Sequence, residues 1–529
     1  ASNNSALGYA ALGANTTGSV LTAVGSNALA ANTTGTNNVG VGTNAGNGIT
    51  TGTYNVFVGT NSGVATTTAN FNVAVGNLAF DANTTGSNNT ALGMYALSAN
   101  TTAAGNTAIG DQALYVNTTG ASNTAVGKNS LVANTTASNN SAVGYGALGA
   151  ITTGSDNVAV GYNAGDAATQ AHSSVFIGKD AGGAFTTGNA TVAVGMSALA
   201  TGTTASATTT VGFEAGKAIT TGTHNTVLGC QAGLAATTCQ FNTLLGVESG
   251  KAITTGGSNV AVGYQALDAN TTAANNVAVG SYALGASTSG TANVAVGYAA
   301  LDANTTANSN TAVGYSALGG ATTGGVNVAV GQQALNALTT GVSNVAVGYT
   351  AADSITTGNY NVMIGQHAEP SAVDGANQIV IGDLNQVGKG NSTGFIAPST
   401  GAVYQGNNST AWTATSDRRI KKDITPSEKG LKEINQLVPC TFFYKSDEEL
   451  NEIPEFEGCH ENLPQDILTT SAIAQEVREV FPEAVTERND FGMLAVNNDP
   501  ITWAMVNAIK ELSTQVDELK SEIKSLKGK

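Results

Sequence analysis

The sequence predicts a mostly β protein, in which a parallel β-solenoid (β-roll) shaft of 23 seventeen-residue coils precedes a small α+β domain with a C-terminal coiled-coil helix. Three observations lead to this prediction. A Gly recurs at every seventeenth position from Gly8 to Gly382. Residues 1–382 hold four Lys and no Arg, whereas the other 15 of the 19 cationic residues follow residue 382. Aliphatic residues with heptad spacing follow Pro500.

The strict period is the strongest structural signal in the chain. It runs through 23 repeats without an insertion or a deletion. A loop tolerates changes in length, but a stacked coil does not, because one extra residue breaks its alignment with both neighbours. We therefore predict a solenoid rather than low-complexity disorder. Seventeen residues suit a narrow coil of two short strands and two turns.

One strand is expected just before each recurring Gly. The residue before this Gly is aliphatic in all 23 repeats, and the residue two positions earlier is Val, Thr, Ser or Ile. The residue between them is Ala in 15 repeats. Since side chains alternate along a strand, both faces are apolar and we expect both to be buried. A narrow coil has one interior, so we infer that the Ala face packs against another chain.

The other half of the repeat has the composition of turns. Ala or Ser stands three residues after the recurring Gly in 22 of 23 repeats, and Asn-Thr-Thr often follows. Asn stands four residues before this Gly in 18 repeats, which predicts a ladder of Asn amides along the solenoid axis. Asn-Thr-Thr also matches the N-glycosylation pattern, but we interpret these Asn as turn residues. They are Asn15, Asn32, Asn83, Asn100, Asn117, Asn134, Asn270 and Asn304.

Composition and charge exclude several functions. The net charge is −16, and so few cations in residues 1–382 cannot neutralise many phosphates, so we expect no nucleic-acid binding. No apolar run reaches the ~18 residues of a membrane span. Cys230 and Cys239 form no CxxC pair, and we expect neither a metal nor a cofactor. Calcium-binding β-rolls need Asp-rich units, and ice-binding solenoids need alternating rather than adjacent Thr, so both functions rank low.

The shaft also resembles a known family. Units such as Asn293-Val-Ala-Val-Gly-Tyr298 are similar to the head repeats of trimeric autotransporter adhesins over about residues 1–382. That resemblance implies left-handed parallel β-rolls in a homotrimer. The 12 Asp and Glu of this region are scattered, so we expect no glycan-cleaving centre in the shaft.

Beyond residue 382 the period stops. We expect a connector or stem over 383–415 and a separate domain over 416–529. The expected elements of that domain are a strand at 420–424, a helix at 427–437, a strand at 442–444, a helix at 472–480 and a long helix after residue 500.

The long helix has an apolar seam with spacings of 3, 4, 3, 4 and 3 residues. Its members are Ile509, Leu512, Val516, Leu519, Ile523 and Leu526. β-branched residues at a and Leu at d favour a parallel dimer when the seam is taken alone. A helix that docks this stripe on its own domain is the alternative.

Three segments of this domain carry a second resemblance. Residues 416–424 (Ser-Asp-Arg-Arg-Ile-Lys-Lys-Asp-Ile), 472–477 (Ala-Ile-Ala-Gln-Glu-Val) and 481–483 (Phe-Pro-Glu) resemble the C-terminal intramolecular chaperone of endosialidase-type phage tail spikes and fibres. The resemblance covers residues 416–529. It implies that this domain trimerises the fibre and then cuts the chain between Thr415 and Ser416, using Ser416 and Lys421.

The implied self-cleavage is chemically coherent. A Ser hydroxyl is a weak nucleophile that needs a base. Lys421 can serve as that base if burial or nearby cations lower its pKa, and Arg418, Arg419 and Lys422 could supply the positive field. We therefore expect a single-turnover serine peptidase in this domain and no turnover enzyme in the shaft.

The two resemblances together lead to a functional prediction. We expect a structural homotrimeric fibre, a phage tail fibre on the virion that attaches to a host surface receptor or glycan. The alternative is a bacterial cell-surface or secreted trimeric adhesin that uses the same chaperone module.

Overall fold

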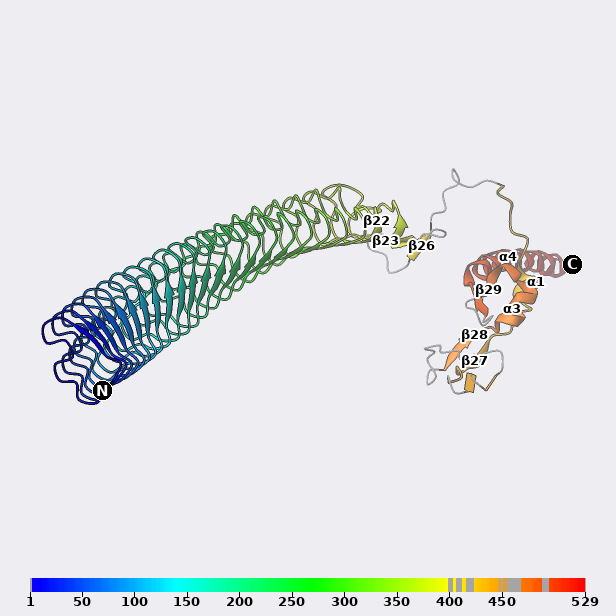
Figure 1. Ribbon diagram of the computed structural model, residues 1–529. Helices are drawn as coiled ribbons and strands as arrows, with labels where there is room; N and C mark the ends of the chain where they lie inside the picture. The colour runs from blue at the N-terminus through cyan, green and yellow to red at the C-terminus, as the bar shows by residue number, and fades with distance from the viewer. Residues whose placement is uncertain are drawn as a thin grey trace. The chain divides into compact units, whose positions relative to one another are not determined.

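The computed structural model describes residues 2–397, 403–405, 412–414, 423–446, 449–450, 452–453, 468–487 and 494–528. The chain divides into two compact units, residues 1–415 and 416–529. The first unit is a parallel β-solenoid with the predicted 23 coils, which follow one another in chain order (Figure 1). Among the described residues, no helix is both long enough and apolar enough to span a membrane.

Each coil contributes one strand, hydrogen-bonded in parallel to the strands of the coils before and after it. We number positions in a coil from its recurring Gly, so that most strands occupy positions −3 to −1. The strands are β1 (Ser5–Leu7), β2 (Thr22–Val24), β3 (Val39–Val41), β4 (Val56–Val58), β5 (Val73–Val75), β6 (Thr90–Leu92), β7 (Thr107–Ile109), β8 (Thr124–Val126), β9 (Ser141–Val143), β10 (Val158–Val160), β11 (Val175–Ile177), β12 (Val192–Val194), β13 (Thr209–Val211), β14 (Thr226–Leu228), β15 (Thr243–Leu245), β16 (Val260–Val262), β17 (Val277–Val279), β18 (Val294–Val296), β19 (Thr311–Val313), β20 (Val328–Val330), β21 (Val345–Val347), β22 (Val362–Gln366) and β23 (Ile379–Leu384).

The solenoid register extends past the last recurring Gly. β24 (Gly394–Ala397) adds one more parallel strand beside β23. β25 (Val403–Gln405) and β26 (Trp412–Ala414) then continue the sheet in antiparallel pairing. Part of the expected connector is therefore a continuation of the shaft.

The prediction of two strands per coil was wrong. The rest of each coil is turns, whose N–H groups still reach carbonyls of a neighbouring coil, as Leu267 N donates to Ala283 O at 3.0 Å. Residues at −5, +2 and +4 take positive φ, such as Ser258 (58°), Gln265 (51°) and Leu267 (58°). Because left-handed residues turn the chain sharply, these three positions prevent a second strand.

The recurring Gly is required by both conformation and space. Gly263 has a φ of 137°, and a Cβ placed on it would lie 2.6 Å from the carbonyl carbon and oxygen of Gly280 in the next coil. L-residues rarely adopt this φ, and no side chain fits where two backbones approach so closely. The same geometry recurs from Gly8 to Gly365 and explains why Gly stands at this position in those coils.

The predicted Asn ladder at position −4 is confirmed. Asn276 Oδ1 accepts the backbone N–H of Asn293 at 2.9 Å, and Asn276 Nδ2 donates to Gly290 O at 2.9 Å. The same pattern repeats along the solenoid with these side chains buried. Each Asn thus satisfies backbone groups that would otherwise be buried without a hydrogen bond.

The Asn of the Asn-Thr-Thr sequences, at position +7, lie inside the coils as well. Asn83, Asn100, Asn117 and Asn134 form a second ladder in which each Nδ2 donates to the preceding Oδ1 at 2.7–3.1 Å. Their side chains are buried. This agrees with a turn role and leaves these amides inaccessible to a glycosyltransferase in the folded shaft.

The orientation of the strand residues differs from our prediction. The Ala side chains at −2 are buried inside the coil, as at Ala261, Ala278 and Ala295. The aliphatic residues at −3 and −1 point outward and are half-buried or exposed. The Ala face therefore cannot pack against another chain. The interior already receives large side chains from position +4, such as Leu267, and has room only for Ala opposite them.

A larger side chain at position −2 is compensated by smaller residues at the two flanking +4 positions. Where Phe176 replaces Ala at −2, the two flanking +4 positions are Gly165 and Gly182 instead of Leu. A Cβ on Gly182 would lie 2.3 Å from the Phe176 ring, and one on Gly165 would lie 2.7 Å from it. Phe57 shows the same compensation with Gly46 and Gly63.

This compensation predicts that Leu at the flanking +4 positions can restore the stability lost when Phe176 is made smaller. Phe176→Ala should leave a void that costs about 3–5 kcal/mol and lower the melting temperature of the full chain measured by circular dichroism. Adding Gly165→Leu and Gly182→Leu should restore most of the loss, because Leu148 and Leu199 take the same left-handed φ at +4 in adjacent coils. Thr187→Ala, at an exposed +9 position of the same coil, is the control with a smaller effect. A triple variant no more stable than Phe176→Ala would contradict the compensation.

A buried carboxylate lies between two coils near the C-terminal end of the shaft. Glu369 accepts the backbone N–H groups of Asp353 at 3.0 Å and Ser354 at 3.3 Å, together with the Ser354 hydroxyl. Burial, followed by the neighbouring Asp353 carboxylate, raises the pKa of Glu369 to about 7. The folded state therefore holds a proton that the unfolded chain releases at a pH near its ordinary value of 4.5.

A pH dependence follows from this shift. The folded state binds more protons between about pH 4.5 and 7, so the stability of these last coils should fall as the pH rises through that window and level off above it. Amide hydrogen exchange at residues 353–354, corrected for intrinsic base catalysis, should accelerate over the same range. Glu369→Gln should remove this acceleration, whereas Glu214→Gln, at a half-buried carboxylate whose pKa is lowered by hydrogen bonds from Lys217 and Gln231, should not. Equal pH profiles for wild type and Glu369→Gln would refute the assignment.

Candidate functional site

The second unit is a small α+β domain. Its described elements are β27 (Cys440–Phe442), β28 (Thr469–Ser471), β29 (Val485–Glu487), β30 (Leu494–Val496), α1 (Leu431–Ile434), α3 (Ala474–Val480), the 3₁₀ helix η3 (Pro482–Ala484) and α4 (Asn498–Lys527). β27 pairs with β28 and β29 with β30, both antiparallel. Val477, Phe481, Ala484, Val485 and Ala504 form its buried core.

The expected elements were partly correct. The helix expected at 472–480 is confirmed as α3 over 474–480, and the long helix expected after residue 500 is confirmed as α4, which begins at Asn498 and is capped by the side chain of Asn497. The expected helix at 427–437 is reduced to the four residues of α1, and the strand at 442–444 lies at 440–442. Asp423 and Ile424 are not in a strand.

The residues expected to cut the chain lie outside the described residues. These are Thr415, Ser416 and Lys421, together with Arg418, Arg419 and Lys422. Their roles therefore remain predictions. The structure instead shows how the segment that follows them is held.

Residues 427–431 are held against α3, η3 and α4. The Lys429 ammonium donates to Val480 O at 2.7 Å and to Glu483 Oε2 at 3.0 Å, and it lies 4.7 Å from the centre of the Phe481 ring. Hydrogen bonds to backbone N–H groups and to Lys429 lower the pKa of Glu483, which keeps this carboxylate ionised. Lys429 therefore binds a carbonyl, a carboxylate and an aromatic face of one corner of the domain.

α4 holds the same segment from the other side. Asn507 Nδ2 donates to Ser427 O at 3.2 Å and to Lys429 O at 3.0 Å. Glu511 Oε2 accepts the N–H of Leu431 at 3.0 Å. A Cβ on Gly430 would lie 2.0 Å from Glu511 Oε1, so a larger residue there would displace the Glu511 carboxylate that accepts the N–H of Leu431. Sequence reasoning missed Lys429, Asn507 and Glu511, because their spacing of about 80 residues gives no local signal.

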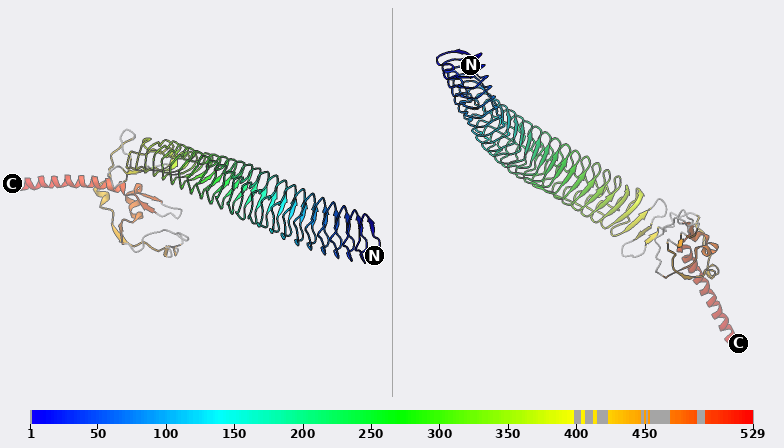
Figure 2. Two further views of the ribbon diagram at one scale, coloured as in Figure 1. Left: turned by 90° about the vertical axis from the view of Figure 1, so that its left-hand side faces the viewer. Right: turned by 60° about the horizontal axis from the view of Figure 1, so that its bottom comes forward.

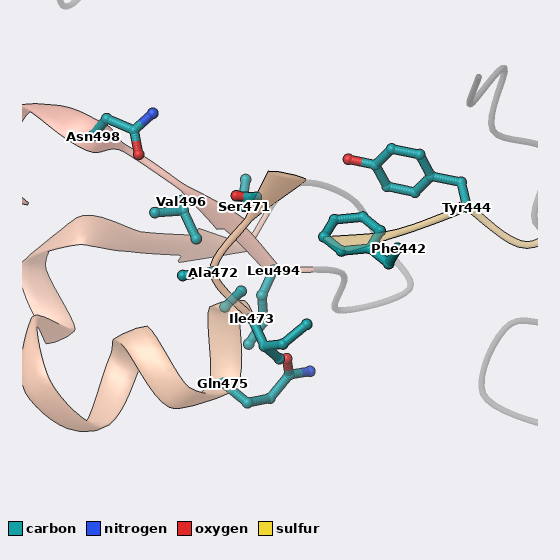
Figure 3. Close-up of a pocket in the computed structure, with 11 residues that line it drawn as sticks. Phe442, Tyr444, Ser471, Ala472, Ile473, Gln475, Leu494, Val496 and Asn498 are labelled. Carbon is teal, nitrogen blue, oxygen red and sulfur yellow. The ribbon is translucent and has the colours of Figure 1, made fainter. Parts of the chain in front are cut away.

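A pocket of about 400 Å³ lies between β27, β28, β30 and the start of α3 (Figure 3). Phe442, Ile473, Leu494 and Val496 supply its apolar walls, and Ser471 and Tyr444 place hydroxyls beside it. Among the described residues that line it there is no carboxylate, His, Lys or Cys. None of these described residues could therefore serve as the base that activates the Ser471 hydroxyl as a nucleophile.

The apolar seam of α4 is exposed. Among the described residues of the domain, contacts with α4 are made by its N-terminal part, through Ile501, Ala504 and Ala508. The exposed fractions of the seam residues are 66% for Ile509, 45% for Leu512, 45% for Val516, 56% for Leu519, 50% for Ile523 and 66% for Leu526. Figure 2 shows this part of α4 extending beyond the other elements of its unit. The alternative, in which the seam docks on its own domain, is wrong.

Comparison with known proteins supports the second resemblance. Residues 416–486 match the sequence profile of the family described as chaperone of endosialidase. The C-terminal unit thus carries a chaperone-of-endosialidase domain, placed after a β-solenoid shaft. The match ends before β30 and α4, so the exposed seam lies outside the matched segment. No solved structure matched the chain.

The hydrogen bonds of Asn507 give a prediction. Asn507→Ala should leave two carbonyls without a side-chain donor and destabilise the docking of residues 427–431 by about 1 kcal/mol. Hydrogen exchange at residues 428–431 of the full chain should accelerate severalfold. Gln515→Ala, at an exposed position of the same helix, should leave that exchange unchanged. Unchanged exchange in Asn507→Ala would contradict the docking role.

Proposed function

We propose that this chain is the subunit of a homotrimeric structural fibre, a phage tail fibre on the virion that takes part in attachment to a host receptor or glycan. Its C-terminal domain assembles three chains and then cuts itself off between Thr415 and Ser416. The observation that carries this proposal is the chaperone-of-endosialidase match at residues 416–486, placed directly after a solenoid shaft.

The exposed seam of α4 supports the assembly step. Six aliphatic side chains with heptad spacing face solvent in the single chain, and such a stripe is stabilised when helices of other copies cover it. Residue choice at a and d favours two helices, whereas the chaperone family is associated with trimeric fibres. We propose three copies, and the mass of the assembled chain in sedimentation equilibrium separates three from two.

Assembly at the C-terminus would speed the alignment of the shafts. Parallel strands pair slowly and expose aggregation-prone surface while they do so. Helices that gather chain ends raise the local concentration of the shafts, so that the coils can align from one end. Removal of the chaperone domain afterwards would leave the shaft kinetically trapped in its assembled state.

The self-cleavage has a direct test. Freshly expressed wild type should yield fragments that end at Thr415 and begin at Ser416, identified by intact mass. Ser416→Ala should remain full length because the nucleophile is lost. Lys421→Arg keeps the positive charge but cannot act as a base at neutral pH, so its cleavage should slow by at least 100-fold.

Ser471→Ala, which removes an exposed hydroxyl of the same domain, is the matched control and should cleave like wild type. Full-length wild type would remove the proteolytic part of the proposal and leave the fibre assembly standing. Cleavage of Ser416→Ala at the wild-type rate would show that another group is the nucleophile.

The alternative of a bacterial cell-surface or secreted adhesin rests on the similarity of the shaft units to adhesin head repeats. The place where the protein is found distinguishes a phage tail fibre from a bacterial adhesin. Antibodies against the shaft should decorate purified virions if the proposal is correct, and bacterial cells or culture medium if the alternative is correct.

A further inference from the structure

The exposed large hydrophobic side chains of the shaft lie on one face. Of the 33 such residues within 2–382, 31 occupy positions −5, −3, −1 or +1, and the two others are Tyr115 and Val373. These four positions alternate with inward-facing residues along one stretch of each coil, as in Ser258-Asn-Val-Ala-Val-Gly-Tyr264, where Asn259 and Ala261 are buried. We call the surface formed by positions −5, −3, −1 and +1 the strand face.

The strand face has a layered composition. Positions −3 and −1 contain no charged residue in any of the 23 coils; −1 is aliphatic throughout, whereas −3 is Val or Ile in 13 coils and Thr or Ser in ten. Positions +1 and −5 flank these two columns; +1 is aromatic in eight coils and −5 in four, and Asp111, Lys128, Asp156 and Lys179 also stand at these positions. Rings in consecutive coils stack along the axis, with centroids 5.2 Å apart for Tyr54 and Phe71 and 5.3 Å apart for Tyr298 and Tyr315. Stacked aromatic pairs thus occur at several places along the face.

The rest of the coil surface is different in character. Position +8 is Thr in 21 consecutive coils, and most of these hydroxyls donate to the Thr carbonyl of the next coil, as from Thr288 to Thr305 at 3.1 Å. Position +9 is mostly an exposed Thr, such as Thr153 or Thr306. One side of the coil is thus polar, while the central columns of the strand face, positions −3 and −1, carry no charged residue.

We propose that the strand face is the surface through which copies of this chain pack together, parallel and with equivalent coils at equal height. The number of copies, three, rests on the proposed function. Parallel sheets are normally covered on both faces, and here the coil interior covers only one. Two further copies would cover the other face and leave the Thr columns in water.

The size of the strand face favours other copies of this chain as the partner that covers it. Aromatic side chains bury 150–250 Å² when fully covered, so even ~50 Å² for each of the 31 exposed residues gives on the order of 1,500 Å². A standard interface needs ~800 Å² per partner, and a monomer rarely exposes an apolar patch above ~600 Å². A compact partner covers about 20–30 residues, whereas this face runs from Leu7 to Ile379, a length that another copy of the shaft matches.

Protection of engineered thiols in the protein assembled from the full expressed chain tests the inference. Val160 at −1 has an exposed fraction of 39% in the single chain, and Thr153 at +9 of the preceding coil is also exposed. Val160→Cys should react with N-ethylmaleimide at least tenfold more slowly than Thr153→Cys, as followed by peptide mass spectrometry, which resolves the native cysteines. Val313→Cys and Thr306→Cys repeat the comparison about nine coils away.

The mass of each variant in sedimentation equilibrium separates the outcomes. Protection of both −1 thiols in a multi-chain species supports the inference. Equal rates at −1 and +9 in a multi-chain species overturn it and leave the proposed assembly standing. Equal rates in a single-chain species remove the inference and the proposed assembly together, and protection in a single chain would show that something other than a second copy covers the face.

Discussion

Close backbone contact between neighbouring coils, at the recurring Gly, is the constraint on which the rest of the shaft depends. The carbonyl of one such Gly occupies the space that a side chain on the preceding one would need, as Gly280 does for Gly263. Strand pairing and the Asn ladder connect residues seventeen apart, so both require this spacing. A single inserted residue would separate all these partners in its own coil, which accounts for 23 repeats of identical length.

The backbone repeats in each coil, but the interior side chains differ from coil to coil in volume and polarity. Ala at −2 faces Leu at +4 in most coils, and Phe176 and Phe57 face Gly instead. Position +7 is a buried Asn in some coils and an apolar residue, such as Ile253 or Phe185, in others. The Asn side chains bond to neighbouring Asn and carbonyl groups. Each coil is therefore packed locally, and such a shaft can accept substitutions one coil at a time as long as its backbone stays in register.

Both units expose apolar side chains on one side. In the shaft, apolar side chains collect on the strand face and Thr on another side of the coil. In the C-terminal unit, α4 packs through Ala504 and Ala508 and exposes its heptad seam. The segment after the predicted cut is held between α4 and the corner formed by α3 and η3. A helix that gathers chains would thus also position the segment that leads from the cleavage site.

The sequence by itself determined the solenoid, its period, the Gly positions and the Asn ladder, because backbone stacking imposes the same residue at the same place in every coil. It also identified the chaperone-like segments, whose similarity does not depend on knowing their contacts. Only the tertiary structure decided which strand face lies inside. Alternation along a strand defines two faces, but the room left by Leu at +4 selects Ala, and not Val, for the interior. The single strand per coil likewise required the left-handed turns at −5, +2 and +4, and the roles of Lys429, Asn507 and Glu511 required contacts between residues far apart in the chain.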